Sequence, residues 1–292
     1  MSNKIIILGS GGFIGSWLLQ RFSSDNFEVF GYSSKECDLL DKEQIAKVLS
    51  FITTNDIIIF ASCITRIKEN NYDSMIKNIT MMENLLNFLE NHPCKYFIFF
   101  STVEVYGFVQ PYEKVSEKLL LAPRDYYSIS KATNEYLLNN FCLKKKLPCL
   151  ILRLPGVYGP GDKGKSTINK LVESAIFDKK ITVFGGGSDK RDFVYVDDIY
   201  KILNESIKKK INLTLNLATG QSYKISEIAS LLGTICKGNF FVEYLHENKA
   251  KEKRVKDLVY DVTLLEKSFS EIKLTNLKEG LLLYLNWFLV NN

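Results

Sequence analysis

Residues 4–15 read KIIILGSGGFIG, an apolar run followed at once by a turn with glycines at positions 9, 12 and 15. The apolar run is typical of a buried strand, and the residues from Phe13 onward have helical periodicity. Gly9, Gly12 and Gly15 permit a tight turn and close backbone approach, so that a pyrophosphate can lie at the helix N-terminus. Glycine clusters also occur in ordinary strand-to-helix turns. The place of this one, between the first strand and the first helix, favours a dinucleotide site.

The alternation of strand and helix continues through the first half of the chain. Further apolar runs are EVFGY, DIIIFA, KYFIFFS and CLILRL, and helical periodicity recurs near 13–24, 41–53, 72–91 and 126–146. This alternation predicts an α/β fold, a Rossmann-type doubly wound parallel sheet with helices on both faces.

After Pro155 the pattern is less regular, with Gly-rich loops and two helices near 225–233 and 277–290. We therefore expect a smaller, mixed C-terminal lobe that binds the substrate. The expected dinucleotide-binding domain comprises residues 1–154 and 192–220, and the expected substrate lobe comprises residues 155–191 and 221–292.

Composition argues against several other classes of protein. The chain has 292 residues, 46% of them hydrophobic and 24% charged, which suffices for a full core. Its net charge of +5 comes from scattered lysines without interleaved aromatics, so no nucleic-acid partner is expected. Six cysteines without a CxxC pair, and two distant histidines, predict free thiols, no metal site and a reducing compartment. With no signal peptide and no apolar run of membrane-spanning length, we expect a cytoplasmic protein without a membrane partner.

The end of the second strand bears on the choice between NAD and NADP. An NAD site usually carries an acidic residue there, which accepts the ribose 2'-hydroxyl. Here EVFGY is followed by Ser33, Ser34 and Lys35, with Glu36 as the nearest acid. Hydroxyls and a lysine suit a 2'-phosphate better, so we favour NADP, with NAD as the alternative if Glu36 turns inward. Asp38 either accepts from the adenine amino group or caps the following helix.

Candidate catalytic residues lie on the helix near 126–146 and at the end of the strand before it. Tyr127 and Lys131 are four residues apart and therefore share a helical face. An ammonium beside a tyrosine favours the phenolate, which predicts a lowered pKa for Tyr127. Ser101 and Thr102 end KYFIFFST, at the sheet edge where open α/β folds bind ligands. A hydroxyl there can bind the oxygen whose charge changes during hydride transfer, while Tyr127 exchanges the proton.

In this order the motifs resemble the extended short-chain dehydrogenases/reductases of the NAD-dependent epimerase/dehydratase type, which act on nucleotide sugars. The resemblance spans nearly the whole chain and rests on GSGGFIG, STVEVYG, YYSISK, LRLPGVYGPGD, RDFVYVDD and the pair Arg254 and Asp261. It implies an NAD(P)-dependent enzyme acting on a nucleotide-diphosphate sugar. It also implies a homodimer formed through the helices near 72–91 and 126–146, whose apolar positions are explained equally by burial against their own sheet.

The resemblance assigns roles to individual residues. Thr102 resembles the catalytic hydroxyl, Tyr127 the general acid or base, and Lys131 the residue that tunes Tyr127 and holds the nicotinamide ribose. Arg191 and Arg254 resemble diphosphate-binding arginines, although a surface ion pair is the alternative for Arg254. The residues expected to contact the cofactor are Gly9, Gly12, Phe13, Ile14, Gly15, Ser33, Ser34, Lys35, Asp38, Leu39, Ala61, Ser62, Tyr127, Lys131 and Val157. Those expected to contact the substrate are Thr102, Val103, Arg191 and Arg254.

The reaction depends on the site rather than on the fold. Glu104 matches the position of a glutamate in the family's 4,6-dehydratases and uronate decarboxylases, but Val103 replaces the aspartate that usually precedes it in dTDP-sugar dehydratases. Glu104 is therefore either an extra acid-base group or a hydrogen-bonding residue of the loop. We rank NADP(H)-dependent reduction of a 4-keto nucleotide sugar first, epimerisation second and dehydration or decarboxylation third. A sensor that binds NADP(H) without catalysis would be expected to have lost Tyr127 or Lys131.

Overall fold

The computed structural model describes residues 4–109, 114–162, 166–236, 241–245 and 258–291. The chain divides into two compact units. The first comprises residues 1–107, 120–153 and 200–215, and the second comprises residues 108–119, 154–199 and 216–292.

The first unit is built on a six-stranded sheet with the strand order β11-β6-β4-β3-β1-β2. Its strands are β1 (Lys4–Leu8), β2 (Glu28–Tyr32), β3 (Ile57–Phe60), β4 (Tyr96–Thr102), β6 (Cys149–Leu154) and β11 (Leu213–Asn216). β1 runs parallel to both β2 and β3, and β3 runs parallel to β4. The residues of β3 and β4 are buried throughout, which is why these strands read as continuous apolar runs rather than alternating ones.

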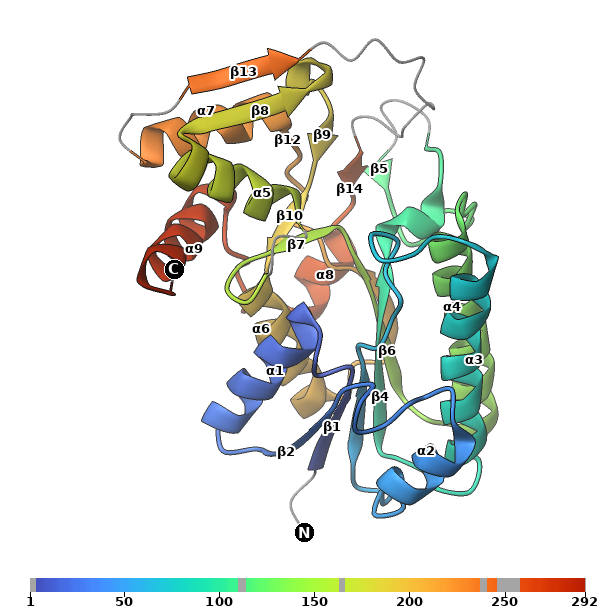
Figure 1. Ribbon diagram of the computed structural model, residues 1–292. Coiled ribbons are helices and arrows are strands. Elements are labelled where there is room, and N and C mark those ends of the chain that lie inside the picture. The colour runs from blue at the N-terminus through green and yellow to red at the C-terminus, as the bar shows by residue number, and fades with distance from the viewer. Residues whose placement is uncertain (1–3, 110–113, 163–165, 237–240, 246–257, 292) are drawn as a thin grey trace. The chain divides into compact units, whose positions relative to one another are not determined.

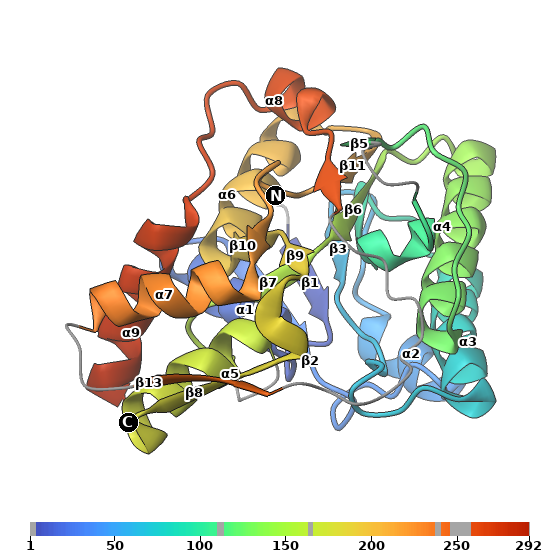
Figure 2. The same ribbon diagram turned by 90° about the horizontal axis from the view of Figure 1, so that it is seen from above.

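Helices cover both faces of this sheet (Figures 1 and 2). The helices are α1 (Phe13–Ser24), α2 (Lys42–Leu49), α3 (Tyr72–Leu89), α4 (Tyr126–Lys145) and α6 (Val196–Lys209), with a short 3-10 turn η1 (Val103–Tyr106) after β4. α1 and α6 lie on one face, and α2, α3 and α4 on the other. Capping boxes begin both α3, at Asn71 and Ser74, and α4, at Asp125 and Ser128, so the start of each helix is specified locally.

The second unit contains pairs of short strands around its own apolar core. Its strands are β5 (Lys114–Val115), β7 (Gly156–Tyr158), β8 (Lys180–Phe184), β9 (Lys190–Arg191), β10 (Phe193–Tyr195), β12 (Tyr223–Lys224), β13 (Phe241–Leu245) and β14 (Val259–Tyr260). Its helical segments are α5 (Thr167–Glu173), η2 (Ser174–Asp178), η3 (Gly185–Gly187), α7 (Ile225–Ile235), α8 (Thr263–Ser268) and α9 (Leu277–Asn291). β7 pairs with β10, β8 with β13, β9 with β12 and β5 with β14. Tyr158, Phe193 and Tyr284 lie in the core that these elements enclose.

The predicted Rossmann-type α/β fold is confirmed, and the six predicted helices are present within a few residues of their expected bounds. The compact units differ from the expected domains, because residues 108–119, 154, 192–199 and 216–220 belong to the second unit. Long-range hydrogen bonds and strand pairing connect these residues to the rest of the second unit. The Val115 carbonyl accepts from the Asp261 N–H at 2.9 Å and from the Asn216 side-chain amide at 3.0 Å, and β10 pairs with β7.

The structure also bears on the state of the cysteines and on the expectation that no segment spans a membrane. The six cysteines are free thiols. Within the described part of the chain, no helix combines the length and the apolar character needed to cross a bilayer.

Candidate active site

The glycine turn after β1 is closely packed against two neighbouring segments. The N–H groups of Gly9 and Ser10 donate to the Tyr32 carbonyl at 2.7 and 3.1 Å, which ties the turn to the end of β2. Gly9 has φ +99°, and a Cβ added to it would lie 2.6 Å from the Ser62 nitrogen. A side chain is therefore excluded at Gly9 both by the backbone conformation and by the segment after β3.

The start of α1 can accept an anion. Its N-cap is Gly12, which supplies no side-chain hydrogen bond, and the first turn contains no acidic residue. A Cβ at Gly15 would lie 2.3 Å from the Gly9 carbonyl oxygen, so glycine is needed there for the helix to start this close to the turn. The N–H groups of a first helical turn favour negative charge, and these residues fit the pyrophosphate of NAD(P).

Glu36 binds back onto the end of β2. Its carboxylate accepts from the Ser33 N–H at 2.7 Å and from the Ser33 hydroxyl, and the Lys35 N–H donates to that hydroxyl at 3.2 Å. These hydrogen bonds from Ser33 keep the pKa of the exposed Glu36 carboxyl below its ordinary value. A Cβ at Gly11 would lie 3.0 Å from the Ser33 Cβ, so Ser33 lies directly beside the glycine turn. The candidate ribose position thus contains a carboxylate as well as hydroxyls.

Asp38 does not cap α2. Asp41 has this role, because its carboxylate accepts from the N–H groups of Glu43 and Gln44. Asp38 instead accepts from the Leu40 N–H at 3.0 Å, and its own N–H donates to Gln44. The capping alternative for Asp38 is therefore wrong. Its interaction with the adenine remains a prediction.

Tyr127, Lys131 and Thr102 lie on adjoining elements of the first unit. Tyr127 and Lys131 are one turn apart on α4, and Thr102 is the buried last residue of β4. Lys131 Nζ donates to the Phe100 carbonyl at 2.7 Å and lies 5.9 Å from the centre of the Tyr127 ring. The Thr102 hydroxyl oxygen accepts from the Glu104 N–H at 3.2 Å.

The pKa of Tyr127 is well above its ordinary value of 10. Burial is the main cause, electrostatic interactions with Cys63 and Glu104 raise the pKa further, and Arg66 opposes the shift. The shift is opposite to the lowering expected from the spacing of Tyr127 and Lys131. Lys131 is directed to the Phe100 carbonyl, and burial of the phenol dominates. Without a cofactor, Tyr127 is therefore a protonated phenol at neutral pH.

Glu104, in η1, forms an ion pair with Arg66, which follows β3. Asn70, from the same segment, accepts from the Tyr127 N–H at 3.0 Å through its side-chain oxygen. The segment of residues 64–71 thus contacts both η1 and the start of α4. Sequence reasoning missed Arg66 and Asn70, because TRIKENN reads as an ordinary polar loop and carries no motif.

The other predicted site residues are placed as follows. Ala61 and Ser62 pack against Gly9, Leu39 is buried, and Val103 begins η1. Val157 in β7 and Arg191 in β9 belong to the second unit, where Arg191 is paired with Tyr223. Arg254 lies outside the described residues.

The sheet, the glycine turn and the anion-accepting start of α1 define a Rossmann-type dinucleotide-binding protein. The sequence matches the NAD dependent epimerase/dehydratase family over residues 5–218, and the chain belongs to this family.

The chain is similar to several known members. It is 28% identical over 260 residues to the uncharacterized UDP-glucose epimerase YtcB of Bacillus subtilis strain 168, a match that covers 80% of this chain and 82% of that protein. It is 31% identical over 235 residues to a GDP-6-deoxy-D-talose 4-dehydrogenase of Aggregatibacter actinomycetemcomitans, covering 78% of this chain and 79% of that protein. The UDP-glucose 4-epimerase structure from Thermotoga maritima has the same fold, with a TM-score of 0.87 and 22% identity over 98% of this chain and 99% of that one. This chain is thus an NAD(P)-dependent enzyme that modifies nucleotide sugars.

Proposed function

We propose that this protein is an NADPH-dependent reductase of a 4-keto nucleotide-diphosphate sugar. The observation that carries the proposal is the ion pair between Arg66 and Glu104. Dehydration or decarboxylation would need Glu104 as an additional acid-base group, and here its carboxylate is engaged by a guanidinium. Reduction of a ketone needs one proton donor, and the raised pKa of Tyr127 means that its phenol holds a proton at neutral pH.

Individual residues have distinct roles in this proposal. When bound, NADPH supplies the hydride. Tyr127 donates the proton to the sugar carbonyl oxygen, and the Thr102 hydroxyl donates a hydrogen bond to that oxygen as its negative charge develops. Lys131 holds the nicotinamide ribose, and the start of α1 binds the pyrophosphate. Arg191 and Arg254 bind the diphosphate of the substrate.

A relative supports this reaction class. A 4-dehydrogenase, as the relative from A. actinomycetemcomitans is named, oxidises the C4 hydroxyl of a nucleotide sugar. The same chemistry in the other direction is reduction of a 4-keto sugar.

A second candidate is an epimerase that retains NAD. Glu36 favours it, because a carboxylate beside Ser33 at the end of β2 can accept the ribose 2'-hydroxyl of NAD. In the proposed reductase, the Ser33 N–H and hydroxyl bind the 2'-phosphate in place of Glu36, with Lys35 adjacent.

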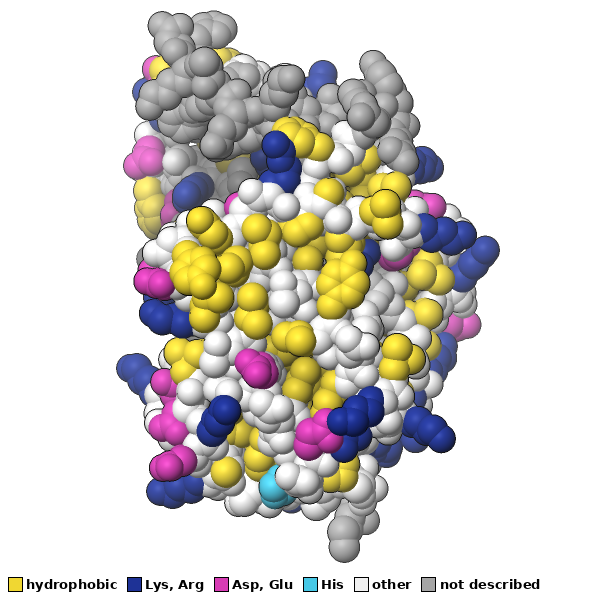
Figure 3. All heavy atoms as spheres, turned by 90° about the vertical axis from the view of Figure 1, so that its right-hand side faces the viewer, with side chains coloured by type: hydrophobic (Ala, Val, Ile, Leu, Met, Phe, Trp, Pro, Cys, Tyr) yellow, Lys and Arg dark blue, Asp and Glu magenta, His cyan; other side chains and the backbone are white. Residues whose placement is uncertain are grey.

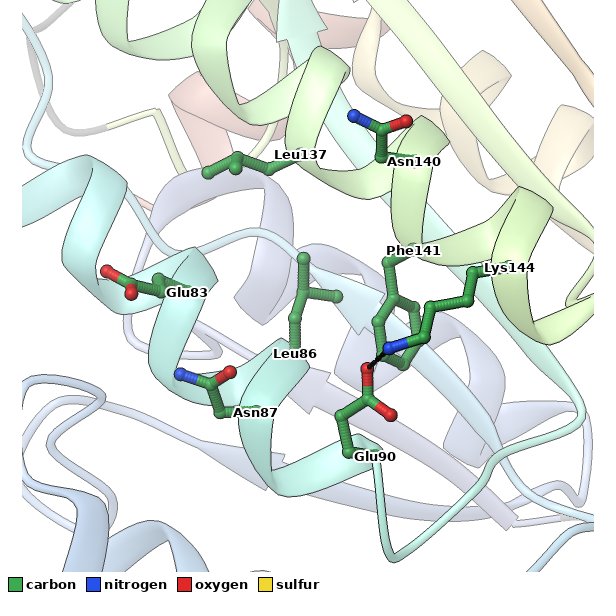
Figure 4. A pocket seen from close by; sticks show the side chains of 8 residues that line it. All are labelled: Glu83, Leu86, Asn87, Glu90, Leu137, Asn140, Phe141 and Lys144. Atoms are coloured by element: carbon green, nitrogen blue, oxygen red, sulfur yellow. Dashed lines mark hydrogen bonds and ion pairs between the residues drawn. The ribbon is translucent and has the colours of Figure 1, made fainter.

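We also propose a homodimer formed through α3 and α4. Apolar side chains gather on the face of the molecule that these helices form (Figure 3). Tyr136 and Leu143 of α4 are 63% and 79% exposed, and Tyr72 and Ile76 of α3 are exposed as well. A groove of about 370 Å³ runs between the two helices (Figure 4). Its lining residues are Glu83, Leu86, Asn87, Glu90, Leu137, Asn140, Phe141 and Lys144.

The first experiment is mass spectrometry of the small molecules released on denaturation, followed by titration of NADPH and NADH into the emptied protein. Little retained cofactor, preference for NADPH, and NADPH oxidation with a 4-keto nucleotide sugar are expected. Stoichiometric retained NAD without NADPH oxidation would instead exclude the reductase and favour an epimerase, a dehydratase or a decarboxylase.

Tyr127→Phe provides the test of mechanism. Loss of the proton donor is expected to lower kcat about 1000-fold while the Kd for NADPH stays the same. Tyr126→Phe is the matched control, because the neighbouring Tyr126 is exposed and has no role in the proposal. A Tyr127→Phe variant with wild-type turnover would exclude this mechanism.

A further inference from the structure

A buried ion pair joins α4 to β6 beneath the candidate active site. The side chains of Glu135 and Arg153 are only 3% and 7% exposed. Arg153 Nη2 donates to Glu135 Oε2 at 2.6 Å, and Arg153 Nε donates to Glu135 Oε1 at 3.0 Å. The guanidinium therefore binds the carboxylate side-on, through two donors of one edge.

Hydrogen bonds extend this pair in both directions. The Ser101 hydroxyl donates to Glu135 Oε1 at 2.5 Å, and Arg153 Nη1 donates to the Tyr106 hydroxyl at 2.8 Å. Ser101, Tyr106, Glu135 and Arg153 together are called the Glu135 network below. All four side chains are buried.

The Glu135 network reaches both ends of the segment that carries Thr102. Ser101 immediately precedes Thr102, and Tyr106 is the last residue of η1, which Thr102 caps. Glu135 lies one turn after Lys131 on α4, and Lys131 itself binds the Phe100 carbonyl. Residues 127, 131 and 135 thus form one stripe on α4, and two of them bind the end of β4 directly.

Stability alone is a poor explanation for a buried ion pair. The free energy needed to remove two charges from water is about as large as the free energy gained from their attraction. Apolar residues of similar volume therefore often give a protein of equal or greater stability. A carboxylate that accepts from a strand-end hydroxyl, on the turn next to Lys131, has a specific consequence: it fixes the end of β4 relative to α4.

We propose that the Glu135 network is a positioning device, which sets the Thr102 hydroxyl and η1 relative to Tyr127. This inference rests on the proposed roles of Thr102 and Tyr127. Reacting groups must be placed accurately, and a displacement of about 1 Å costs on the order of 100-fold in rate. Ser101, Tyr106, Glu135 and Arg153 touch neither substrate nor cofactor in this proposal and act only through Thr102 and η1.

The test removes the hydroxyl of Ser101 or of Tyr106 and keeps the ion pair between Glu135 and Arg153. Glu135→Gln would leave Arg153 as an unpaired buried charge and risk unfolding. Ser101→Ala and Tyr106→Phe each delete one hydroxyl and keep the ion pair. Ser206→Ala is the matched control, because its buried hydroxyl donates to the Ile202 carbonyl on α6, away from the network.

The first measurement needs no substrate. Amide hydrogen exchange is expected to rise about 10-fold or more at residues 103–107 in Ser101→Ala and Tyr106→Phe. The Glu104 N–H, which donates to Thr102, is the most informative probe. Ser206→Ala should leave this segment at the wild-type rate.

The second measurement is kinetic. With a 4-keto nucleotide sugar, Ser101→Ala and Tyr106→Phe are expected to lower kcat roughly 10- to 100-fold, with KM and the Kd for NADPH changed less than about 3-fold. Ser101→Thr, which keeps the hydroxyl, should restore most of the rate.

The outcomes separate the two proposals. Wild-type exchange at residues 103–107 in both variants, or a loss of activity no larger than that of Ser206→Ala, would overturn the positioning role. If the wild-type protein does not reduce 4-keto sugars, the proposed function fails, and the exchange measurement still decides whether the network fixes this segment.

Discussion

At the scale of single residues, we propose that Glu36 determines whether the end of β2 favours NADPH or NADH. Its carboxylate uses the Ser33 N–H and hydroxyl, which are the donors that a 2'-phosphate would need. In the proposed cofactor site, NADPH would therefore have to displace Glu36 from Ser33, whereas NADH would use the Glu36 carboxylate as an acceptor.

We predict that Glu36→Gln binds NADPH about 3- to 10-fold more tightly than the wild type, because a negative charge beside the 2'-phosphate is removed. Isothermal titration of NADPH and of NADH would measure the Kd of each cofactor. Glu266→Gln, on the exposed surface of α8, removes the same charge elsewhere and should change neither Kd. Weaker NADH binding in Glu36→Gln, with no gain for NADPH, would favour the NAD-retaining epimerase.

Tyr127 gives a pH prediction. An acid catalyst is active while it holds its proton, so activity is lost as the pH rises through its pKa. Because burial keeps the pKa of Tyr127 well above 10, kcat/KM for reduction should be level from about pH 6 to 9 and fall only at higher pH. A fall centred near pH 7 or 8 would contradict this prediction.

At the scale of elements, β1 and α1 meet so closely that there is little space for side chains at their junction. A Cβ at Gly15 would lie 2.3 Å from the Gly9 carbonyl oxygen, whereas one at Gly12 would lie 3.4 Å from the same oxygen. The first contact requires the backbone to move, and the second is ordinary van der Waals contact.

Gly15→Ala is therefore expected to lower Tm by roughly 5 °C, as overpacking of a closed site does. Gly12→Ala should lower Tm by less than half as much. Both should weaken NADPH binding, because both alter the turn that approaches the pyrophosphate. Differential scanning calorimetry with and without NADPH separates the two effects, and equal Tm values for the two variants would show that the turn adapts to a side chain at Gly15.

At the scale of the whole molecule, the exposed apolar side chains of α3 and α4 should determine the oligomeric state. Leu143→Glu places a charge in this face and is expected to convert a dimer into a monomer, measured by size-exclusion chromatography with light scattering. Leu120→Glu is the control, because Leu120 is 89% exposed and lies outside both helices. A wild-type protein that is monomeric at all concentrations would exclude this interface.

The sequence by itself determined the fold and the local geometry of the site. Strand and helix periods follow from neighbouring residues, so the apolar runs, the glycine turn and the shared face of Tyr127 and Lys131 could be predicted without coordinates. The order of motifs then identified the family, which the comparisons confirm.

Only the tertiary structure showed which distant side chains meet. Arg66 pairs with Glu104 and Glu135 with Arg153, and the partners in each pair come from different elements. Burial also raises the pKa of Tyr127, where its spacing from Lys131 predicted a lowering. Local periodicity does not predict these contacts, because an ion pair or a desolvated phenol depends on which segments the fold brings together.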